Sequence, residues 1–364
     1  MAIDGLDLIS SAHYGEAGPP HPQWRELRAQ PLHHFQPEGY EPFWAVTRHA
    51  DIVEISSRPE DFCNGEGIVI LTEEQAYRRD NPQIPVQMKT IIEMDPPDHR
   101  VFRKVASGYF TPRGIERLDE IVTTSARQVI DALGEEGETD FVEQVTQQHP
   151  LRVLSTILGI EPDQEQQLLE LTTQLFGGDD PELQRGGETR DEANLALFMD
   201  FFDMFNTIIQ DRRANPRDDL ATMLATATLE TGEPLGDIET LGYYLIVFNA
   251  GHDTTRHSLT GAFQAFLDNP GELQRLKDDP SLMKTAVEEV VRYTAPVNYM
   301  KRTATRDLVY DGHEIKKGDR FALFYASANR DIEVFDDPDR FDIGRHPTRH
   351  LGFGWAEHYC LGAH

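Results

Sequence analysis

The residue with the most distinctive chemistry is Cys360, which lies in the segment Phe353–Gly362 (FGWAEHYCLG). Glycines on both sides of the cysteine would let the backbone approach a flat ligand closely. A thiolate is a strong ligand for iron, and neighbouring backbone N–H groups can keep it ionised. A single cysteine is more often an inert buried side chain, so this loop alone leaves both interpretations open.

A second candidate is the segment Ala250–Thr255 (AGHDTT), inside a predicted helix whose preceding residues are apolar or aromatic on nearly every side. Such a helix should be buried. Burying Asp253 without a partner would be costly, and Gly251 within a helix costs about 1 kcal/mol relative to alanine. Gly251 could let a bulky ligand lie against the helix, and Thr254 could bond a backbone carbonyl one turn back and locally open the helix. The alternative is a structural polar network.

Two further pairs have the spacing of neighbours on one helix face. His99 and Arg103 are four residues apart, and two donors so placed suit a carboxylate or a phosphate. A solvated basic face is the alternative. Glu289 and Arg292 are three residues apart, a spacing that ordinary surface ion pairs share. Neither pair is decisive by itself.

Composition restricts the class of protein. The 364 residues are 39% hydrophobic, enough for a sizeable core, and the net charge of −29 opposes binding to nucleic acid and to anionic lipid. Two cysteines form no disulfide framework, and there is no signal peptide and no membrane span. The histidines have no zinc-site spacing, and no nucleotide-binding glycine motif occurs. We therefore expect a soluble, cytoplasmic protein.

Hydrophobic periodicity predicts a mainly α-helical protein with minor β structure. A helix should begin at Asp98, after two prolines. Helical spacing recurs in the ranges 114–135, 162–176, 191–213, 236–266 and 280–294. Strands are expected at 43–47, 307–316 and 321–325, and a short helix at 51–57. Residues 1–40 look irregular, and residues 64–92 are expected to be a mobile surface region. No linker divides the chain, so we expect residues 1–364 to form one large domain.

The order of the motifs is more specific than any one of them. His-x-x-x-Arg, Ala-Gly-x-Asp-Thr-Thr, Glu-x-x-Arg and Phe-Gly…His-x-Cys-x-Gly follow one another as they do in the cytochrome P450 family. The chain resembles that family from about residue 40 to its end. It also resembles the bacterial terpineol hydroxylase type, on Met94–Pro97, Ala250–Thr255, Ser327–Asp331 and His350–Trp355.

This resemblance implies a cytochrome P450 fold with a long central helix over haem b (iron protoporphyrin IX). Cys360 would be the thiolate ligand of the iron, and its electron push would favour O–O cleavage. Thr254 would steady the bound oxygen, and Asp253 would relay protons from solvent. Glu289 and Arg292 would form a buried ion pair. The resemblance also implies haem contacts, including contacts with the propionates, at His99, Arg103, Arg302, His358, Ala250, Gly251 and Phe353.

The resemblance further implies substrate contacts in residues 64–92, on the helix face near Val247, and at Val297, Asn298 and Met300. These side chains are mostly apolar, which suits a small hydrophobic molecule such as a terpenoid or another cyclic hydrocarbon; a steroid or a fatty acid is the alternative. No flavin or nicotinamide fingerprint is present, so electrons for O2 would come from an iron–sulfur ferredoxin with a separate reductase. Candidate basic residues for docking an acidic ferredoxin are Arg100, Lys104, Arg113, Arg345 and Arg349.

Two alternatives to a monooxygenase stay open: a haem enzyme that uses peroxide directly, and a non-catalytic haem-binding or sensing protein. Asp253 and Thr254 argue against the first, because such a pair suits proton delivery to bound oxygen. Two features depart from the family pattern. Ala356 stands where a second glycine is usual. The sequence also ends at His364, whereas family members continue through a helix and a β-hairpin, so we expect a truncated domain.

Overall fold

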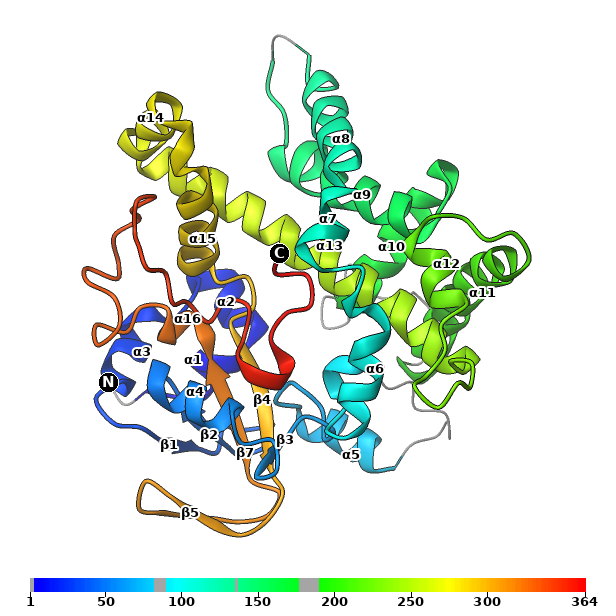
Figure 1. Cartoon of the computed structure of the whole chain (residues 1–364). Coiled ribbons are helices and arrows are strands. Elements are labelled where there is room, and N and C mark those ends of the chain that lie inside the picture. The colour runs from blue at the N-terminus through cyan, green and yellow to red at the C-terminus, as the bar shows by residue number, and fades with distance from the viewer. Residues whose placement is uncertain (1–2, 82–89, 135–136, 177–189) are drawn as a thin grey trace. The chain divides into compact units, whose positions relative to one another are not determined.

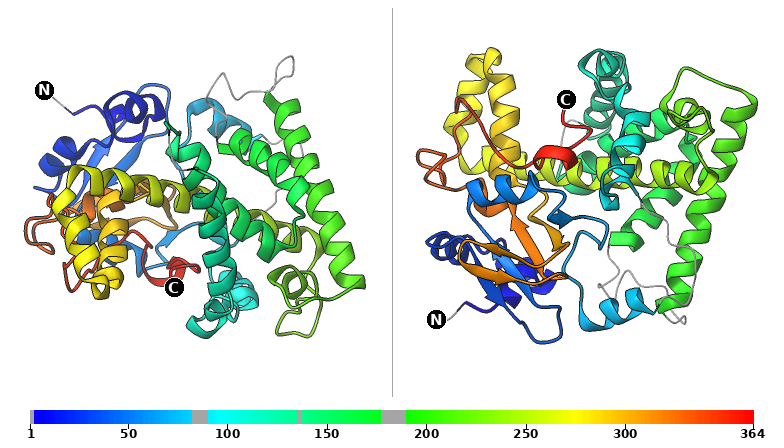
Figure 2. Two further views of the ribbon diagram at one scale, coloured as in Figure 1. Left: turned by 90° about the horizontal axis from the view of Figure 1, so that it is seen from above. Right: turned by 60° about the horizontal axis from the view of Figure 1, so that its bottom comes forward.

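A computed structural model of the chain describes residues 3–81, 90–134, 137–176 and 190–364. They form two compact units. The first draws on residues 1–87, 92–97 and 261–363, and the second on residues 88–91 and 98–260. The longest helix, α13 (Asp237–Asp268), contributes residues to both units and is continuous in Figures 1 and 2. The expected mainly α-helical fold with minor β structure is confirmed, whereas one domain over residues 1–364 stays a prediction.

The first unit is built on a five-stranded sheet with the order β1-β2-β7-β4-β3 (Figure 1). Its strands are β1 (His33–Phe35), β2 (Phe43–Val46), β3 (Phe62–Cys63), β4 (Tyr299–Ala304) and β7 (Arg320–Phe324). Strands β2 and β7 are parallel, and the other pairs are antiparallel. Successive residues of β7 belong to two different core clusters, Phe321 and Leu323 to one, and Ala322 and Phe324 to the other. The sheet is therefore buried on both faces, as the period-two alternation of a strand requires.

Helices of the first unit supply the apolar side chains that cover these faces. Trp24 and Leu27 pack in the cluster that contains Phe324, and Ile52 and Ile55 in the cluster that contains Phe321. The helices are α1 (Leu6–Ile9), α2 (Ser11–Ala17), α3 (His21–Leu27), α4 (His49–Ser56), α5 (Glu73–Asp80), α14 (Pro270–Asp278), α15 (Met283–Thr294) and α16 (Tyr325–Ala328). A separate hairpin consists of β5 (Leu308–Tyr310) and β6 (His313–Ile315).

Apart from a bridge at Thr228 and Pro234, the described residues of the second unit are helical or irregular. The helices are α6 (Asp98–Ser107), α7 (Pro112–Glu116), α8 (Asp119–Asp131), α9 (Gln148–Leu158), α10 (Glu165–Phe176), α11 (Arg190–Ala214) and α12 (Leu220–Ala225). The N-terminal half of α13 is buried among them. For example, Tyr244 is fully buried, its ring lies 5.5 Å from that of Phe205, and its hydroxyl donates to the Ala221 carbonyl at 2.8 Å.

Two sequence-based expectations are wrong. Residues 1–40 are not irregular, because they form three helices and a strand, and Trp24 packs its ring 5.6 Å from that of Phe324. Residues 64–92 are not merely a surface region either. Ile70 is buried in the core of the first unit, and α5 follows it, whereas residues 82–89 lie outside the described residues. Short helices with few apolar residues lack the periodicity that would reveal them.

Strand β4 and helices α9, α12 and α14 were not expected from the sequence either. In β4 the reason is physical. Lys301 and Arg302 are both buried, with 1% and 4% of their surface exposed, so polar residues occupy core positions and hide the apolar alternation. The expected helices at 191–213 and 236–266 correspond closely to α11 and α13, and the expected strands at 43–47 and 321–325 to β2 and β7.

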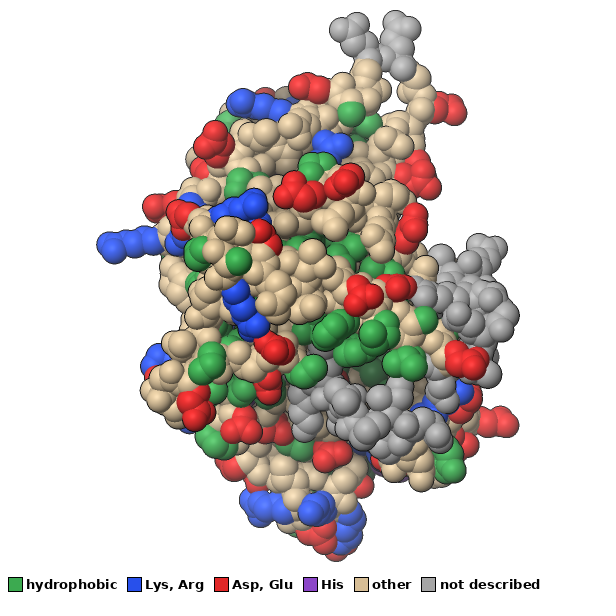
Figure 3. Space-filling view, turned by 90° about the vertical axis from the view of Figure 1, so that its right-hand side faces the viewer, with side chains coloured by type: hydrophobic (Ala, Val, Ile, Leu, Met, Phe, Trp, Pro, Cys, Tyr) green, Lys and Arg blue, Asp and Glu red, His purple; other side chains and the backbone are tan. Residues whose placement is uncertain are grey.

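The surface reflects the acidic composition. On the face drawn in Figure 3, Asp and Glu side chains are spread widely, and Lys and Arg side chains are fewer. Within the described ranges, no helix has the length and apolar character needed to cross a bilayer.

A fully buried ion pair joins α15 to the irregular segment that follows α16. Glu289 and Arg292 have no exposed surface, and Arg292 donates through Nε and Nη2 to the two carboxylate oxygens at 2.7 and 2.8 Å. Arg292 Nη1 donates to the carbonyls of Asn329 and Pro338, both at 2.8 Å. Arg345 approaches the same carboxylate, with Nε 3.1 Å from Oε2. The pair therefore holds together backbone that is far apart in the sequence.

We predict that Glu289→Gln lowers the free energy of unfolding by about 3–5 kcal/mol, because it leaves the guanidinium groups of Arg292 and Arg345 without their buried carboxylate. Urea denaturation followed by circular dichroism measures the change. The matched control is Glu74→Gln, which removes an exposed pair with Arg78 and should cost below about 1 kcal/mol. Equal losses in both variants would contradict the structural role of the buried pair.

Candidate active site

The segment Ala250–Thr255 lies in the middle of α13, within the second unit. Phe248 and Asn249 before it are buried, but Ala250 is exposed, so the helix opens one face at this point. A Cβ atom on Gly251 would lie 3.0 Å from Cδ2 of Leu154 in α9. Close packing against Leu154 therefore favours a residue without a side chain at this position, and the expected approach of a bulky ligand stays a prediction.

Thr254 and Asp253 make different kinds of bond. The hydroxyl of Thr254 donates to the Ala250 carbonyl at 2.6 Å, one turn back, while the segment stays helical. The carboxylate of Asp253 accepts from Arg256 Nη2 at 2.6 Å, and His257 Nε2 lies 3.4 Å from its other oxygen. Burial raises the pKa of Asp253, but the bonds to His257 and Arg256 outweigh burial and bring this pKa to about 2. Asp253 is therefore a carboxylate at neutral pH.

Three residues around this pair were not singled out from the sequence. Arg256 and His257 partner Asp253, and their spacing of three and four residues on a helix was the signal that could have identified them. His252 is buried, with Nε2 3.2 Å from the Gln147 carbonyl, and burial lowers its pKa. Nothing local in the sequence indicates the partner of His252, which lies 105 residues earlier.

Cys360, in the first unit, lies in a loop closed by its own backbone. The N–H of Cys360 donates to the Phe353 carbonyl at 2.8 Å, and the N–H of Gly354 donates to the Leu351 carbonyl at 2.9 Å. The ring of Phe353 packs 5.4 Å from that of His350. Cys360 is exposed and forms no disulfide bond. The loop thus presents a thiol on a constrained backbone.

The backbone conformation at Ala356 explains why an alanine is less favourable than the usual glycine at this position. Ala356 has a φ of +57°, in the left-handed region that favours glycine. It begins the short 3-10 helix η5 (Ala356–His358), which leads into Cys360. The methyl group is accommodated, but the residue is strained.

The first unit also offers a buried cation to a ligand carboxylate. Arg302 on β4 is 4% exposed, and its Nη1 donates to the Lys301 carbonyl at 2.9 Å. Within the described ranges, no Asp or Glu forms an ion pair with Arg302. A buried guanidinium without a carboxylate partner is costly, so the position suits a carboxylate supplied by a bound group. With the thiol of Cys360 and the imidazole of His358 in the same unit, these donors fit a haem and its propionates.

The other expected site residues lie as follows. His99 and Arg103 are on one face of α6 in the second unit, and His99 is buried. Val297 and Met300 are half-buried and pack against the core of the first unit. The Asn298 carbonyl accepts from the Ala326 N–H at 3.3 Å. Val247 is half-buried on α13.

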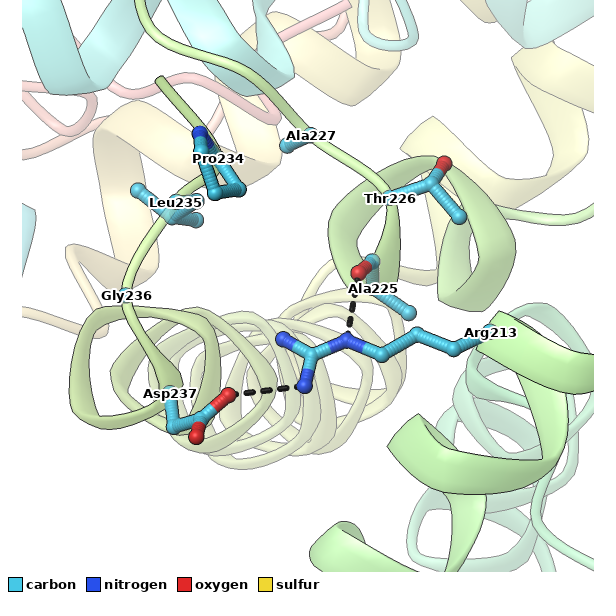
Figure 4. A pocket seen from close by; sticks show the side chains of 8 residues that line it. All are labelled: Arg213, Ala225, Thr226, Ala227, Pro234, Leu235, Gly236 and Asp237. Atoms are coloured by element: carbon cyan, nitrogen blue, oxygen red, sulfur yellow. Dashed lines mark hydrogen bonds and ion pairs between the residues drawn. The ribbon is translucent and has the colours of Figure 1, made fainter.

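A shallow pocket in the second unit is not a candidate for the site (Figure 4). Its guanidinium, Arg213, pairs with Asp237 at 2.7 Å and donates to the Ala225 carbonyl at 2.9 Å. The guanidinium of Arg213 and the carboxylate of Asp237 therefore pair with each other inside the pocket. Among the described residues, no cluster of His, Cys, Asp and Glu could hold a metal ion by itself.

Comparison with known proteins assigns the family. The cytochrome P450 family model matches residues 188–364. Cytochrome P450-terp of a Pseudomonas species is 40% identical over 355 residues, which cover 94% of this chain and 83% of that protein. This chain belongs to the cytochrome P450 family. Linalool 8-monooxygenase of Pseudomonas putida is also similar to this P450, with 34% identity over 94% of this chain and 84% of that protein.

Solved structures agree with this assignment. CYP108D1 from Novosphingobium aromaticivorans matches this P450 with a TM-score of 0.88 and 34% identity, over 98% of this chain and 86% of that chain. The Mycobacterium marinum cytochrome P450 CYP268A2, solved in complex with pseudoionone, matches with a TM-score of 0.86 and 31% identity, over 100% and 89%. The expected P450 fold and the expected enzyme class, a cytochrome P450 monooxygenase, are confirmed, and the family implies a haem-iron cofactor.

We predict that Ala356→Gly raises the free energy of unfolding by about 1 kcal/mol, because glycine adopts a positive φ without strain. Thermal denaturation measures the gain. The control Ala29→Gly changes an exposed residue that is not among those with positive φ, so it should be neutral or destabilising. If both variants lose stability, Ala356 is not strained.

We predict that Arg256→Gln raises the pKa of Asp253, since one of the two groups that lower it is removed. The folded-state pKa of about 2 lies below the ordinary 3.8, so ionised Asp253 contributes stability above pH 4, which is lost as the pH falls towards 2. The stability advantage of the parent over Arg256→Gln, about 1–2 kcal/mol at pH 7, should therefore shrink between pH 5 and pH 3. Urea denaturation across this range measures it, and a constant difference would contradict the pairing.

Proposed function

We propose that this P450 is a haem–thiolate monooxygenase that inserts one oxygen atom of O2 into a small hydrophobic substrate, a terpenoid or another cyclic hydrocarbon. The observation that carries the proposal is the exposed thiol of Cys360 on a loop closed by its own backbone, at the end of the motif order. Bound haem b supplies the iron at which O2 is activated.

The residues that would hold the haem divide by chemistry. Cys360 provides the thiolate ligand of the iron. As the family resemblance implies, Arg302, His358, His99 and Arg103 would provide donors for the propionates. Apolar contacts with the macrocycle fall to Ala250, which is exposed on an otherwise buried stretch of helix, and to Phe353. The absence of an ion-pair partner for Arg302 among the described residues supports this assignment.

Asp253 and Thr254 would handle protons. The hydroxyl of Thr254 donates to the Ala250 carbonyl, so its oxygen can accept a hydrogen bond from a bound group without breaking that contact. The side chain of His257 is 51% exposed and lies 3.4 Å from Oδ2 of Asp253, which links the carboxylate to solvent. A proton can pass from solvent to His257 Nε2 and on to Asp253 Oδ2.

A terpenoid substrate is supported by the relatives. Linalool is a monoterpene alcohol, and the relative named for it is 34% identical. Cytochrome P450-terp, at 40% identity, also supports a terpenoid, and a steroid stays the alternative because steroid C26-monooxygenase of Mycolicibacterium smegmatis is 35% identical. Val247, Val297 and Met300 would provide the apolar wall and Asn298 the polar contact.

An iron–sulfur ferredoxin with a separate reductase would supply the electrons, and a cytoplasmic location fits the two cysteines. The expectation that Arg345 is available for docking is wrong. Its side chain is 11% exposed, and its donors go to Glu289 and to the carbonyls of Asp336 and Asp337. Lys104 is paired with Glu230. Lys104, Arg100 and Arg113 in the second unit and Arg349 in the first are exposed and stay candidates.

We predict that the haem-reconstituted protein, reduced and exposed to carbon monoxide, has the strongly red-shifted Soret band of a thiolate ligand. Cys360→His should abolish this band, because imidazole replaces the thiolate. Cys63→Ser, which changes the other free cysteine, is the matched control and should keep the band. A histidine-type band in the parent, or an unchanged band in Cys360→His, would contradict the proposal.

A further inference from the structure

Lys301 is a buried lysine that the proposed chemistry does not use. It lies in the middle of β4, with 1% of its surface exposed. Its ammonium group donates to the Glu66 carbonyl at 2.8 Å. In the part of the chain that the structure describes, no carboxylate forms an ion pair with it. The buried charge is thus compensated mainly by a backbone carbonyl.

Such a position is unfavourable for a lysine. Burial lowers the pKa of Lys301 to about 8, and the charge of Glu41 opposes this only in part. An apolar side chain of similar length would avoid the desolvation cost. The bond between Lys301 and Glu66 therefore calls for an explanation other than stability alone.

The backbone that Lys301 holds is the segment Asn64–Leu71. Lys301 also donates from its backbone N–H to the Ile68 carbonyl at 2.6 Å, and the hydroxyl of Tyr299 accepts from the N–H of Ile70 at 3.2 Å. Lys301 and Tyr299 are two residues apart on one strand, so they share a face of β4. One face of β4 thus anchors the middle of the segment.

Both ends of the segment are fixed by carboxylates. Asp95 accepts from the N–H groups of Asn64 and Gly65 at 2.7 and 3.0 Å. Glu41 accepts from the N–H of Leu71 at 3.3 Å. Between these ends, Lys301 is the long side chain that reaches the turn at Glu66, next to Gly67 with its φ of +89°. Its ammonium therefore ties the turn to β4, in addition to the bond from the Gly67 N–H to the Asn64 carbonyl at 2.9 Å.

The apolar side chains of the segment differ in how exposed they are. Ile70 is buried in the core, Ile68 is half-buried, and Val69 is 46% exposed. A shift of the turn at Glu66 would change which of these side chains is presented outward. The next residue of β4, Arg302, projects to the opposite face, so one strand holds the segment and also offers the guanidinium assigned to a propionate.

We propose that Lys301 is a positioning residue for substrate selection: its ammonium group fixes the turn at Glu66, and through it the apolar side chains of Ile68 and Val69 that face the substrate. This inference rests on the proposed function and on the substrate contacts that the family resemblance implies for residues 64–92.

The test compares Lys301→Met with Lys316→Met, which changes a lysine that is 61% exposed and directly follows β6 of the separate hairpin. Lys301→Met removes the ammonium and keeps the length of the side chain. Amide hydrogen exchange of haem-loaded protein should be on the order of tenfold faster at Gly67 and Ile70 in Lys301→Met, and unchanged in Lys316→Met. Lys301→Gln, which retains an N–H donor, should recover part of the protection. Unchanged exchange in Lys301→Met overturns the anchoring role.

A second measurement addresses selection. Imidazole and 4-phenylimidazole both bind haem iron, but only the larger azole probes the shape of the surrounding pocket. The ratio of their affinities, from absorbance titration, should change by roughly tenfold in Lys301→Met and stay constant in Lys316→Met. Faster exchange with an unchanged ratio overturns the role in selection. A parent without a thiolate-ligated haem defeats the proposed function, and the role in selection with it, whereas the exchange result still decides the anchoring role.

Discussion

The backbone that leads to Cys360 depends on the buried ion pair between Glu289 and Arg292. Two desolvated charges are costly unless every donor and acceptor is used. Here Arg292 donates from Nε and Nη2 to Glu289 and from Nη1 to the carbonyls of Asn329 and Pro338. The side chain of Asn329 then accepts from the N–H of Leu351 at 2.7 Å, just before the cysteine loop. Side-chain hydrogen bonds thereby hold a long segment that has no regular secondary structure. This network fixes the backbone that leads to the thiol of Cys360.

Strand β4 is a second organising element, and its physics is unusual for a core strand. Residues on one face, Tyr299 and Lys301, bind the Asn64–Leu71 segment, while Arg302 points to the other face with no carboxylate partner among the described residues. Burial of two cations in adjacent positions is unfavourable for stability. Because side chains alternate along a strand, Lys301 and Arg302 point to opposite faces, and under the proposed function the first would hold the Asn64–Leu71 segment while the second would bind a propionate.

Asp253 on α13 differs from these buried groups, because its partners are close to it in the sequence. Arg256 and His257 reach Asp253 from the next turn of the same helix, so its low pKa is a property of about two helical turns. The neighbouring Gly251 packs closely against Leu154 of α9, and its expected contact with a bulky ligand stays a prediction. The physical reasons for the residue types at adjacent positions of one motif thus differ, and the motif taken as a whole does not show the difference.

The sequence by itself determined whatever depends on neighbours within about two helical turns. It predicted the helices α11 and α13, the start of α6 at Asp98, the bond from Thr254 to the Ala250 carbonyl, and, through the order of its motifs, the family. Only the tertiary structure decided that the first forty residues fold, that β4 is a strand, and that Arg345 is used inside the protein. The reason is separation along the chain: Lys301 and Glu66 are 235 residues apart, and Arg345 and Glu289 are 56 apart. Contacts between residues so far apart produce no periodic pattern in the local sequence. The partner that compensates the desolvation of a buried polar residue lies in another part of the chain.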